Sequence, residues 1–267
     1  MCILALVLLL ALAGCSGTPR SVTGGTEKPA DNINLKAVDI VSDGSQTVLT
    51  LSLISGSRKA GYPESKLTRL PAYEVTALGQ PYRLKITLDG ISFWDYEQTA
   101  WDFSGLVTGL FREVPAYDDS LVIYVQLARE VEYSVTEDEG SLILTLTSGV
   151  QTDAAGYYCV ADAFYEHQEG VWPGDIDMTP VLCTDSQNKL LISQAFPTQA
   201  EAEAYRQRVS ERLAQELPGK TVSVIYLEAG ALPDYAADID YSLAEEQGVL
   251  LKDGALLSTP VLLNNGR

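Results

Sequence analysis

Residues 46–54 read Gln-Thr-Val-Leu-Thr-Leu-Ser-Leu-Ile, and this stretch indicates the fold class of the first half of the chain. Its apolar residues are broken by Thr50 and Ser52, the period of two that is typical of a β-strand with one buried face. The same kind of pattern returns at 82–88, 121–127, 131–135 and 141–146, and turn signals such as Asp89-Gly90 and Glu139-Gly140 separate the runs. Short strands with frequent turns are typical of a sandwich or a barrel, and we predict an antiparallel β-sandwich over residues 33–149.

The run 82–88 also predicts where its charged side chains lie. In residues 82–88 the apolar Tyr82, Leu84, Ile86 and Leu88 alternate with Arg83, Lys85 and Thr87. Since successive side chains of a strand point to opposite faces, we expect the apolar residues on one face and the charges on the other.

Two stretches of this region repeat one plan, 37–40 followed by 47–53 and 107–111 followed by 120–127. With the strand, acidic turn and closing strand of 129–146, the region resembles the AMIN domain. That domain is a small symmetric β-sandwich of bacterial envelope proteins, including cell-wall amidases and pilus secretins. The resemblance implies targeting to peptidoglycan or to an envelope assembly.

The second half of the chain contains the clearest helix. Thr198 and Glu201 form a capping-box pattern just after Pro197, and Pro218-Gly219 ends the segment. One stripe along it is apolar: Ala202, Tyr205, Val209, Leu213 and Leu217. Strand patterns lie on either side, at 190–196 and 221–227. We therefore predict an α+β domain over residues 156–267, a smaller antiparallel sheet packed on one main helix.

Residues 157–164 and 190–196 both end in Ala-Phe, at an offset of 32 positions. The order of strand, Ala-Phe, alanine-rich helix and strand over residues 190–227 resembles the second half of a SPOR domain. That module binds peptidoglycan glycan strands stripped of their stem peptides. The resemblance implies that the second domain contacts glycan, with Tyr158 and Gln194 as candidate contacts.

Charge and residue inventory exclude several function classes. The chain has 36 acidic and 18 basic side chains, a formal net charge of −18 that repels nucleic acid. It has one histidine, His167, so it has no H-E-x-x-H zinc site, and no serine lies in a G-x-S-x-G motif. We predict a protein that is not an enzyme and that uses no cofactor and no metal.

The N-terminal residues have the pattern of a targeting signal. Residues 3–13 are an unbroken apolar run of 11, whereas a membrane-spanning helix needs about 20 residues. The run ends in Leu12-Ala13-Gly14-Cys15, which resembles the lipobox of bacterial lipoproteins. The resemblance implies a signal peptide over residues 1–14, a lipid on Cys15 and an extracytoplasmic protein anchored to the cell membrane. Residues 15–32 are polar and predict a flexible tether.

Two cysteines remain after this processing. Cys159 and Cys183 form an even pair outside the cytoplasm, which predicts a disulfide. The alternative is a metal site built from both cysteines, His167 and either Asp162 or Asp175, although this spacing matches no zinc motif.

Five of the 22 aromatic residues lie between positions 93 and 103. Aromatic faces stack on sugar rings and carboxylates accept hydrogen bonds from hydroxyls, so this loop is a candidate glycan site. Its contacts would be Trp94, Asp95, Tyr96, Trp101 and Asp102. Two alternatives are open: the aromatics close the end of the sandwich, or Asp95, Glu97 and Asp102 supply an acid and a base for glycoside hydrolysis.

These observations lead to one functional expectation. We expect a non-catalytic, membrane-tethered lipoprotein that binds peptidoglycan or another component of the cell envelope. A structural or regulatory lipoprotein with an envelope protein as its partner is the first alternative. A hydrolase of wall sugars is the second.

Overall fold

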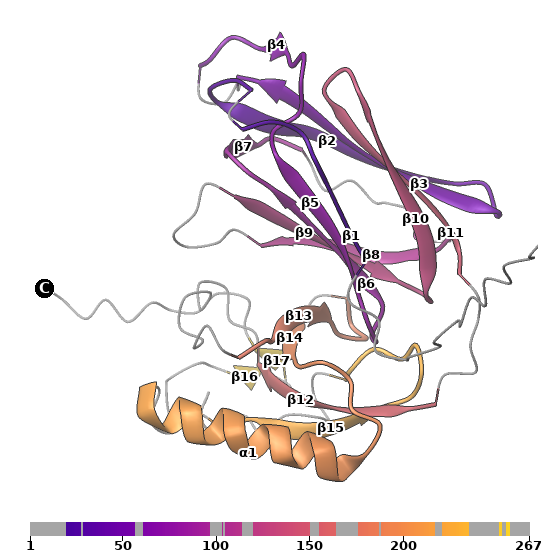
Figure 1. Ribbon diagram of the computed structural model, residues 1–267, viewed down its shortest axis with the longest axis vertical. Helices are drawn as coiled ribbons and strands as arrows, with labels where there is room; N and C mark the ends of the chain where they lie inside the picture. The colour runs from indigo at the N-terminus through magenta and orange to yellow at the C-terminus, as the bar shows by residue number, and fades with distance from the viewer. Residues whose placement is uncertain are drawn as a thin grey trace, which may run out of the picture.

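The computed structural model consists of a β-sandwich and a smaller sheet with one helix (Figure 1). It describes residues 20–27, 29–56, 61–96, 103, 105–113, 120–149, 155–163, 176–186, 188–216, 221–234, 251–252 and 255–256. Cys15, the signal peptide and the first residues of the tether lie outside these ranges. Among the described residues, no helix has the length and apolar character needed to cross a membrane.

The sandwich is built from two sheets. The first sheet has the strand order β1-β5-β6-β9-β8, and the second has β10-β11-β3-β2-β7 with β4 paired to the end of β3. The first sheet contains β1 (Ser21–Gly24), β5 (Tyr73–Leu78), β6 (Arg83–Leu88), β8 (Val107–Glu113) and β9 (Leu121–Leu127). The second contains β2 (Ile33–Ser42), β3 (Gln46–Ser55), β4 (Ser65–Lys66), β7 (Ile91–Trp94), β10 (Val131–Asp138) and β11 (Ser141–Ser148). All neighbours are antiparallel except β2 and β7, which run parallel.

The core lies between these two sheets. Leu51 of β3 pairs with Val38 of β2 and with Leu142 of β11, and all three side chains are buried. They join Ile86 and Ile123 of the first sheet in one continuous apolar cluster. The apolar residues of 46–54 therefore alternate for the predicted reason: one face of this strand lies in the core of the sandwich.

The polar segment before the sandwich is shorter than predicted. Ser21–Gly24 form β1, whose four residues pair with β5 in antiparallel register, and Thr26 N donates to Leu70 O at 3.0 Å. The expected tether over residues 15–32 is thus wrong for this part. Val22 packs against the core, so a backbone ladder and one apolar contact hold a segment whose composition suggested a linker.

The third sheet has the order β13-β14-β12-β15 and one helix, α1, on one face (Figure 1). Its elements are β12 (Tyr157–Ala163), β13 (Thr179–Leu182), β14 (Lys189–Ile192), α1 (Gln199–Glu216) and β15 (Ser223–Leu227). Val209 and Leu213 of α1 pack against Val160 of β12 and against Val222. A separate hairpin joins β16 (Leu251–Lys252) to β17 (Ala255–Leu256). The predicted fold class, a β-sandwich followed by a smaller antiparallel sheet on one main helix, is confirmed.

The capping box at the start of α1 has the geometry that its sequence predicts. Glu201 N donates to Thr198 Oγ1 at 3.3 Å, and Thr198 N donates to Glu201 Oε2 at 3.2 Å. We expect Thr198→Ala to lower the free energy of unfolding by about 1 kcal/mol, because it leaves the Glu201 amide without its acceptor. Urea denaturation would measure this, with the helix-surface variant Ser210→Ala as the control. An unchanged midpoint for Thr198→Ala would contradict the assignment.

The predicted disulfide is wrong. The two cysteines are buried, Cys159 on β12 and Cys183 just after β13, and the structure forms no bond between their sulfurs. Ile192 of β14 lies opposite both Ala161 and Thr179, so the cysteines are six residues apart along the strand direction and two strands apart. At about 3.3 Å per residue this is roughly 20 Å, whereas a disulfide needs Cα atoms within about 7 Å.

The edge strand β13 packs on the outer face of the first sheet. Leu182 contacts Phe111, Val122 and Tyr124 there, and its backbone N–H donates to Gln126 Oε1 at 3.4 Å. The Arg83 guanidinium, on a residue only 3% exposed, donates from Nη1 to Pro180 O at 2.6 Å and from Nε to Pro81 O at 3.0 Å. The predicted alternation is confirmed, since Leu84, Ile86 and Leu88 belong to the sandwich core, and the third sheet covers the opposite face that carries Arg83.

Candidate functional site

Trp94 and Tyr96, the described aromatic candidates of the aromatic loop at 93–103, are attached to the sandwich. Trp94 and Tyr96 pack against the core, and Tyr96 N donates to Leu35 O at 3.2 Å. The Arg112 guanidinium lies over both rings, 5.3 Å from the Trp94 centroid and 5.6 Å from the Tyr96 centroid. Both rings are thus engaged by the core and by Arg112, which agrees with the structural alternative, in which the aromatics close the end of the sandwich.

Asp95 is the one acidic candidate of this loop among the described residues, and it is hydrogen-bonded to an amide side chain. Asp95 is joined to Asn34, which donates from Nδ2 to Asp95 Oδ2 at 2.9 Å and accepts from Asp95 N at 3.0 Å. Asn34 is fully buried, so these bonds tie the loop to β2. Trp101, Asp102 and Glu97 lie outside the described residues. Of the three candidate catalytic carboxylates, only that of Asp95 lies among the described residues, so no distance between two of them supports glycoside hydrolysis.

The candidate contacts of the second domain lie at one end of the third sheet. Tyr158 N and O both bond with Phe196, which is two residues beyond the exposed Gln194. The Tyr158 ring lies 5.0 Å from that of Tyr226, which is 48% exposed. The rings are tilted by 56°, so they do not form one flat platform. The structure brings the Tyr158 and Tyr226 rings together, and it shows no contact of the Gln194 side chain with either ring among the described residues.

The metal alternative cannot use both cysteines, because the strand register separates them. His167 and Asp175 lie outside the described residues. Within the part of the chain that the structure describes, no three His, Cys, Asp or Glu side chains come close enough together to hold a metal ion.

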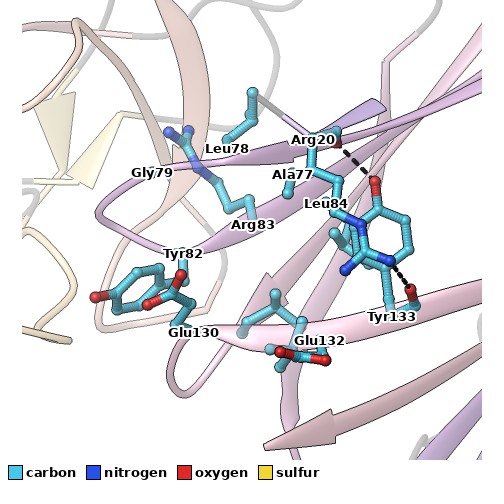
Figure 2. Close-up of a pocket in the computed structure, with 12 residues that line it drawn as sticks. Arg20, Ala77, Leu78, Gly79, Tyr82, Arg83, Leu84, Glu130, Glu132 and Tyr133 are labelled. Atoms are coloured by element: carbon cyan, nitrogen blue, oxygen red, sulfur yellow. Dashed lines mark hydrogen bonds between the residues drawn. The ribbon is translucent and has the colours of Figure 1, made fainter. Parts of the chain in front are cut away.

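A pocket that the sequence did not predict opens at the end of the sandwich (Figure 2). It has a volume of about 300 Å³ and lies between the β5–β6 turn of the first sheet and the start of β10 in the second. Three separate parts of the chain line it: Arg20 before β1, residues 77–79 with 82–84, and Leu127 with 130–133. Only the fold brings these segments together.

The right-hand wall of the pocket in Figure 2 is a paired Arg20 and Tyr133. Tyr133 Oη donates to Arg20 O at 2.7 Å, and Arg20 Nη2 donates to Tyr133 O at 3.1 Å. The guanidinium carbon also lies 5.1 Å from the Tyr133 ring centroid. Burial raises the pKa of the Tyr133 phenol, so its hydroxyl keeps the proton that it donates. These contacts fix the position of an otherwise exposed arginine.

Glu130, Glu132 and Tyr82 lie on the lower side of the pocket in Figure 2. Both glutamates are exposed, and their carboxylates make no hydrogen bond or ion pair within the described ranges. Ala77, Leu84 and Leu127 supply apolar surface. The pocket therefore offers a fixed cation, two carboxylates, an aromatic ring and apolar side chains.

Arg83 also lines the pocket, but its guanidinium is engaged elsewhere. Figure 2 shows it directed away from Arg20 and from both glutamates, toward Gly79. Its N–H groups bond to the carbonyls of Pro81, Thr179 and Pro180. Burial lowers the pKa of Arg83 to about 10, which still leaves it charged at neutral pH. Arg83 thus does not offer its charge to a ligand in the pocket; its hydrogen bonds join the β5–β6 turn to β13.

Comparisons with protein-family models, with curated proteins and with solved structures found no match for this chain. The resemblances to the AMIN and SPOR domains therefore stay predictions, and the function is argued below from the pocket itself.

Proposed function

We propose that this chain is a membrane-tethered, non-catalytic lipoprotein that binds peptidoglycan in the bacterial envelope through the pocket of Figure 2. The observation that supports this most is the pocket's lining. A guanidinium is held in place by Tyr133, and two carboxylates beside it have unused hydrogen-bonding capacity. A concave site with apolar walls and a few convergent polar groups is typical of ligand binding.

The lining favours binding over catalysis. Among the residues that line the pocket there is no serine, threonine, cysteine, histidine or lysine to act as a nucleophile with its base. Glu130 and Glu132 are two residues apart on an extended chain, so their side chains leave it on the same side. Glycoside hydrolysis needs two carboxylates that flank the bond to be broken. Neighbouring carboxylates on one wall are better placed to hold a ligand.

An envelope protein as the partner is the second candidate. It is favoured by the corner of the third sheet, where the exposed Tyr226 lies beside Tyr158. Tyrosine is enriched at protein–protein interfaces, since its ring buries apolar area and its hydroxyl stays hydrogen-bonded. This surface lies outside the residues that line the pocket, so variants separate the two functions.

The test is co-sedimentation of the full-length chain, purified in detergent, with isolated peptidoglycan sacculi. We expect retention of the wild type, and at least a tenfold weaker apparent affinity for the double variant Arg20→Gln/Glu132→Gln, because it removes charge from both walls. The matched control is Arg69→Gln/Glu27→Gln, which changes two exposed residues outside the pocket lining.

Three outcomes separate the alternatives. Loss of retention in the pocket variant with an unchanged control supports the proposal. Retention that the pocket variant leaves unchanged but Tyr226→Ala removes would move the binding site to the third sheet. Absence of wild-type retention would overturn peptidoglycan binding and favour a protein partner.

A further inference from the structure

Charges of opposite sign share the pocket without neutralising each other. Arg20 makes no ion pair with Glu130 or with Glu132 in the described part of the chain, although all three line the same cavity. Elsewhere in this acidic protein, lysine and arginine side chains do pair with carboxylates, as Lys36 does with Glu64 at 2.8 Å and Arg206 with Glu203 at 2.6 Å. The pocket thus keeps both signs of charge available to a ligand.

Arg20 is prepared to receive a carboxylate. A guanidinium has five N–H donors, and one of those of Arg20 goes to Tyr133 O. Two parallel N–H groups suffice for a bidentate bond to a carboxylate, so the remaining donors can form it. Because the Tyr133 carbonyl and ring already hold the guanidinium, binding has little arginine side-chain freedom left to remove.

The opposite part of the pocket is prepared to receive an ammonium group. Glu130 and Glu132 can each accept its hydrogen bonds, and the Tyr82 ring lines the same pocket. An aromatic face and carboxylates together stabilise a desolvated ammonium. The net charge of −18 acts in the same sense, since it disfavours a purely anionic ligand.

Arg83, the second cationic residue that lines the pocket, does not present its charge to a ligand there. The Arg83 guanidinium is directed out of the pocket and is bonded to three backbone carbonyls. One available cation and two carboxylates therefore line the same pocket, together with apolar side chains such as Ala77 and Leu127. This arrangement matches a small molecule that carries both charges on a short carbon skeleton.

We infer that the pocket binds a zwitterionic α-amino-acid group, with its carboxylate on Arg20 and its ammonium on Glu130 and Glu132. The inference rests on the proposed function and names the part of peptidoglycan that is bound. Such a group is present in wall stem peptides wherever a diamino acid keeps one end free. The ligand would then be the peptide part of the polymer, not its sugar rings.

The first experiment titrates three matched probes into the full-length chain in detergent micelles and measures binding by calorimetry. Diaminopimelate carries both groups at each end, pimelate carries only the carboxylates, and 1,5-diaminopentane carries only the amines. We expect diaminopimelate to bind at least tenfold more tightly than either of the others. Arg20→Gln should reduce its affinity at least tenfold, and so should Glu132→Gln, whereas Arg69→Gln should leave it unchanged.

Equal binding of diaminopentane and diaminopimelate would overturn the inference in favour of a simple cation site. Failure of all three probes to bind would overturn it outright.

A second experiment separates this inference from the proposed function. Sacculi are digested with an amidase that removes the stem peptides, and co-sedimentation is repeated with intact and with stripped glycan. Retention by intact sacculi alone supports both ideas. Equal retention by both preparations would leave peptidoglycan binding standing and would overturn the zwitterion inference. If neither preparation retains the protein but diaminopimelate binds, peptidoglycan binding fails and the amino-acid site stands.

Discussion

Replacing Arg83 with alanine is expected to lower the free energy of unfolding by about 3 kcal/mol. The change removes three charge-assisted hydrogen bonds and leaves the buried carbonyls of Pro81 and Pro180 without the guanidinium. It also leaves a cavity where the 3% exposed side chain now packs. Urea denaturation followed by far-UV circular dichroism would measure the effect.

Two further variants separate charge from packing. Arg83→Met fills the volume without burying a charge, so we expect it to destabilise less than Arg83→Ala. Lys85→Ala, two residues along the same strand and only half-buried, is the matched control and should cost about 0.5 kcal/mol or less. An unfolding midpoint of Arg83→Ala equal to that of Lys85→Ala would contradict the role assigned to this arginine.

Replacing Cys15 with alanine is expected to abolish incorporation of fatty acid into the protein. The proposed lipoprotein carries its acyl groups on this residue, because the Leu12-Ala13-Gly14-Cys15 pattern places its sulfur at the processing site. Metabolic labelling of the host cells with an alkyne fatty acid, followed by gel detection, would measure it. Since acylation is all or none at one thiol, the expected change is complete loss of label.

The other cysteines supply the controls. Cys2→Ala falls in the segment that processing would remove, and Cys159→Ala falls in the buried core of the third sheet. Both variants should keep the label of the wild type, provided that the protein accumulates to the same level. Label that persists in Cys15→Ala would refute the lipoprotein assignment, and label lost only in Cys2→Ala would move it to another residue.

Local sequence patterns located several elements of the fold, although not β1. The run 121–127 coincides with β9, residues 46–54 fall within β3, and Thr198 with Glu201 locates the start of α1. These predictions succeed because strand alternation and capping depend on neighbours a few positions away. The buried stripe of Ala202, Val209 and Leu213 follows from the same short-range periodicity.

Features that depend on distant contacts were not predictable in this way. Alternation predicted that Arg83 lies on the face opposite the core, but alternation within one strand carries no information about β13 of another sheet, which covers that face. A signal for that cover was present in β9, whose seven residues are all buried, as its nearly continuous apolar run Leu-Val-Ile-Tyr-Val suggests. The disulfide prediction failed because strand register, not the count of cysteines, decides their separation.

The pocket could not be predicted from the sequence either, because it also depends on contacts between distant segments. Arg20 fell in a segment interpreted as a linker, and Glu130 and Glu132 looked like an ordinary charged turn and strand. Their chemistry depends on the pairing of β1 with β5, which brings Arg20 beside Tyr133. The aromatic loop, by contrast, was conspicuous in sequence and is largely engaged in packing.

If the proposed lipid anchor on Cys15 is present, the early start of β1 limits how far from the bilayer the pocket can lie. Arg20 follows Cys15 by five residues, and five residues of fully extended chain reach about 18 Å at most. With Cys15 acylated, the pocket is confined to a thin shell next to the lipid headgroups and cannot sample deeper layers of the wall. Ligands would have to come to it, which favours newly exported wall material over the mature network.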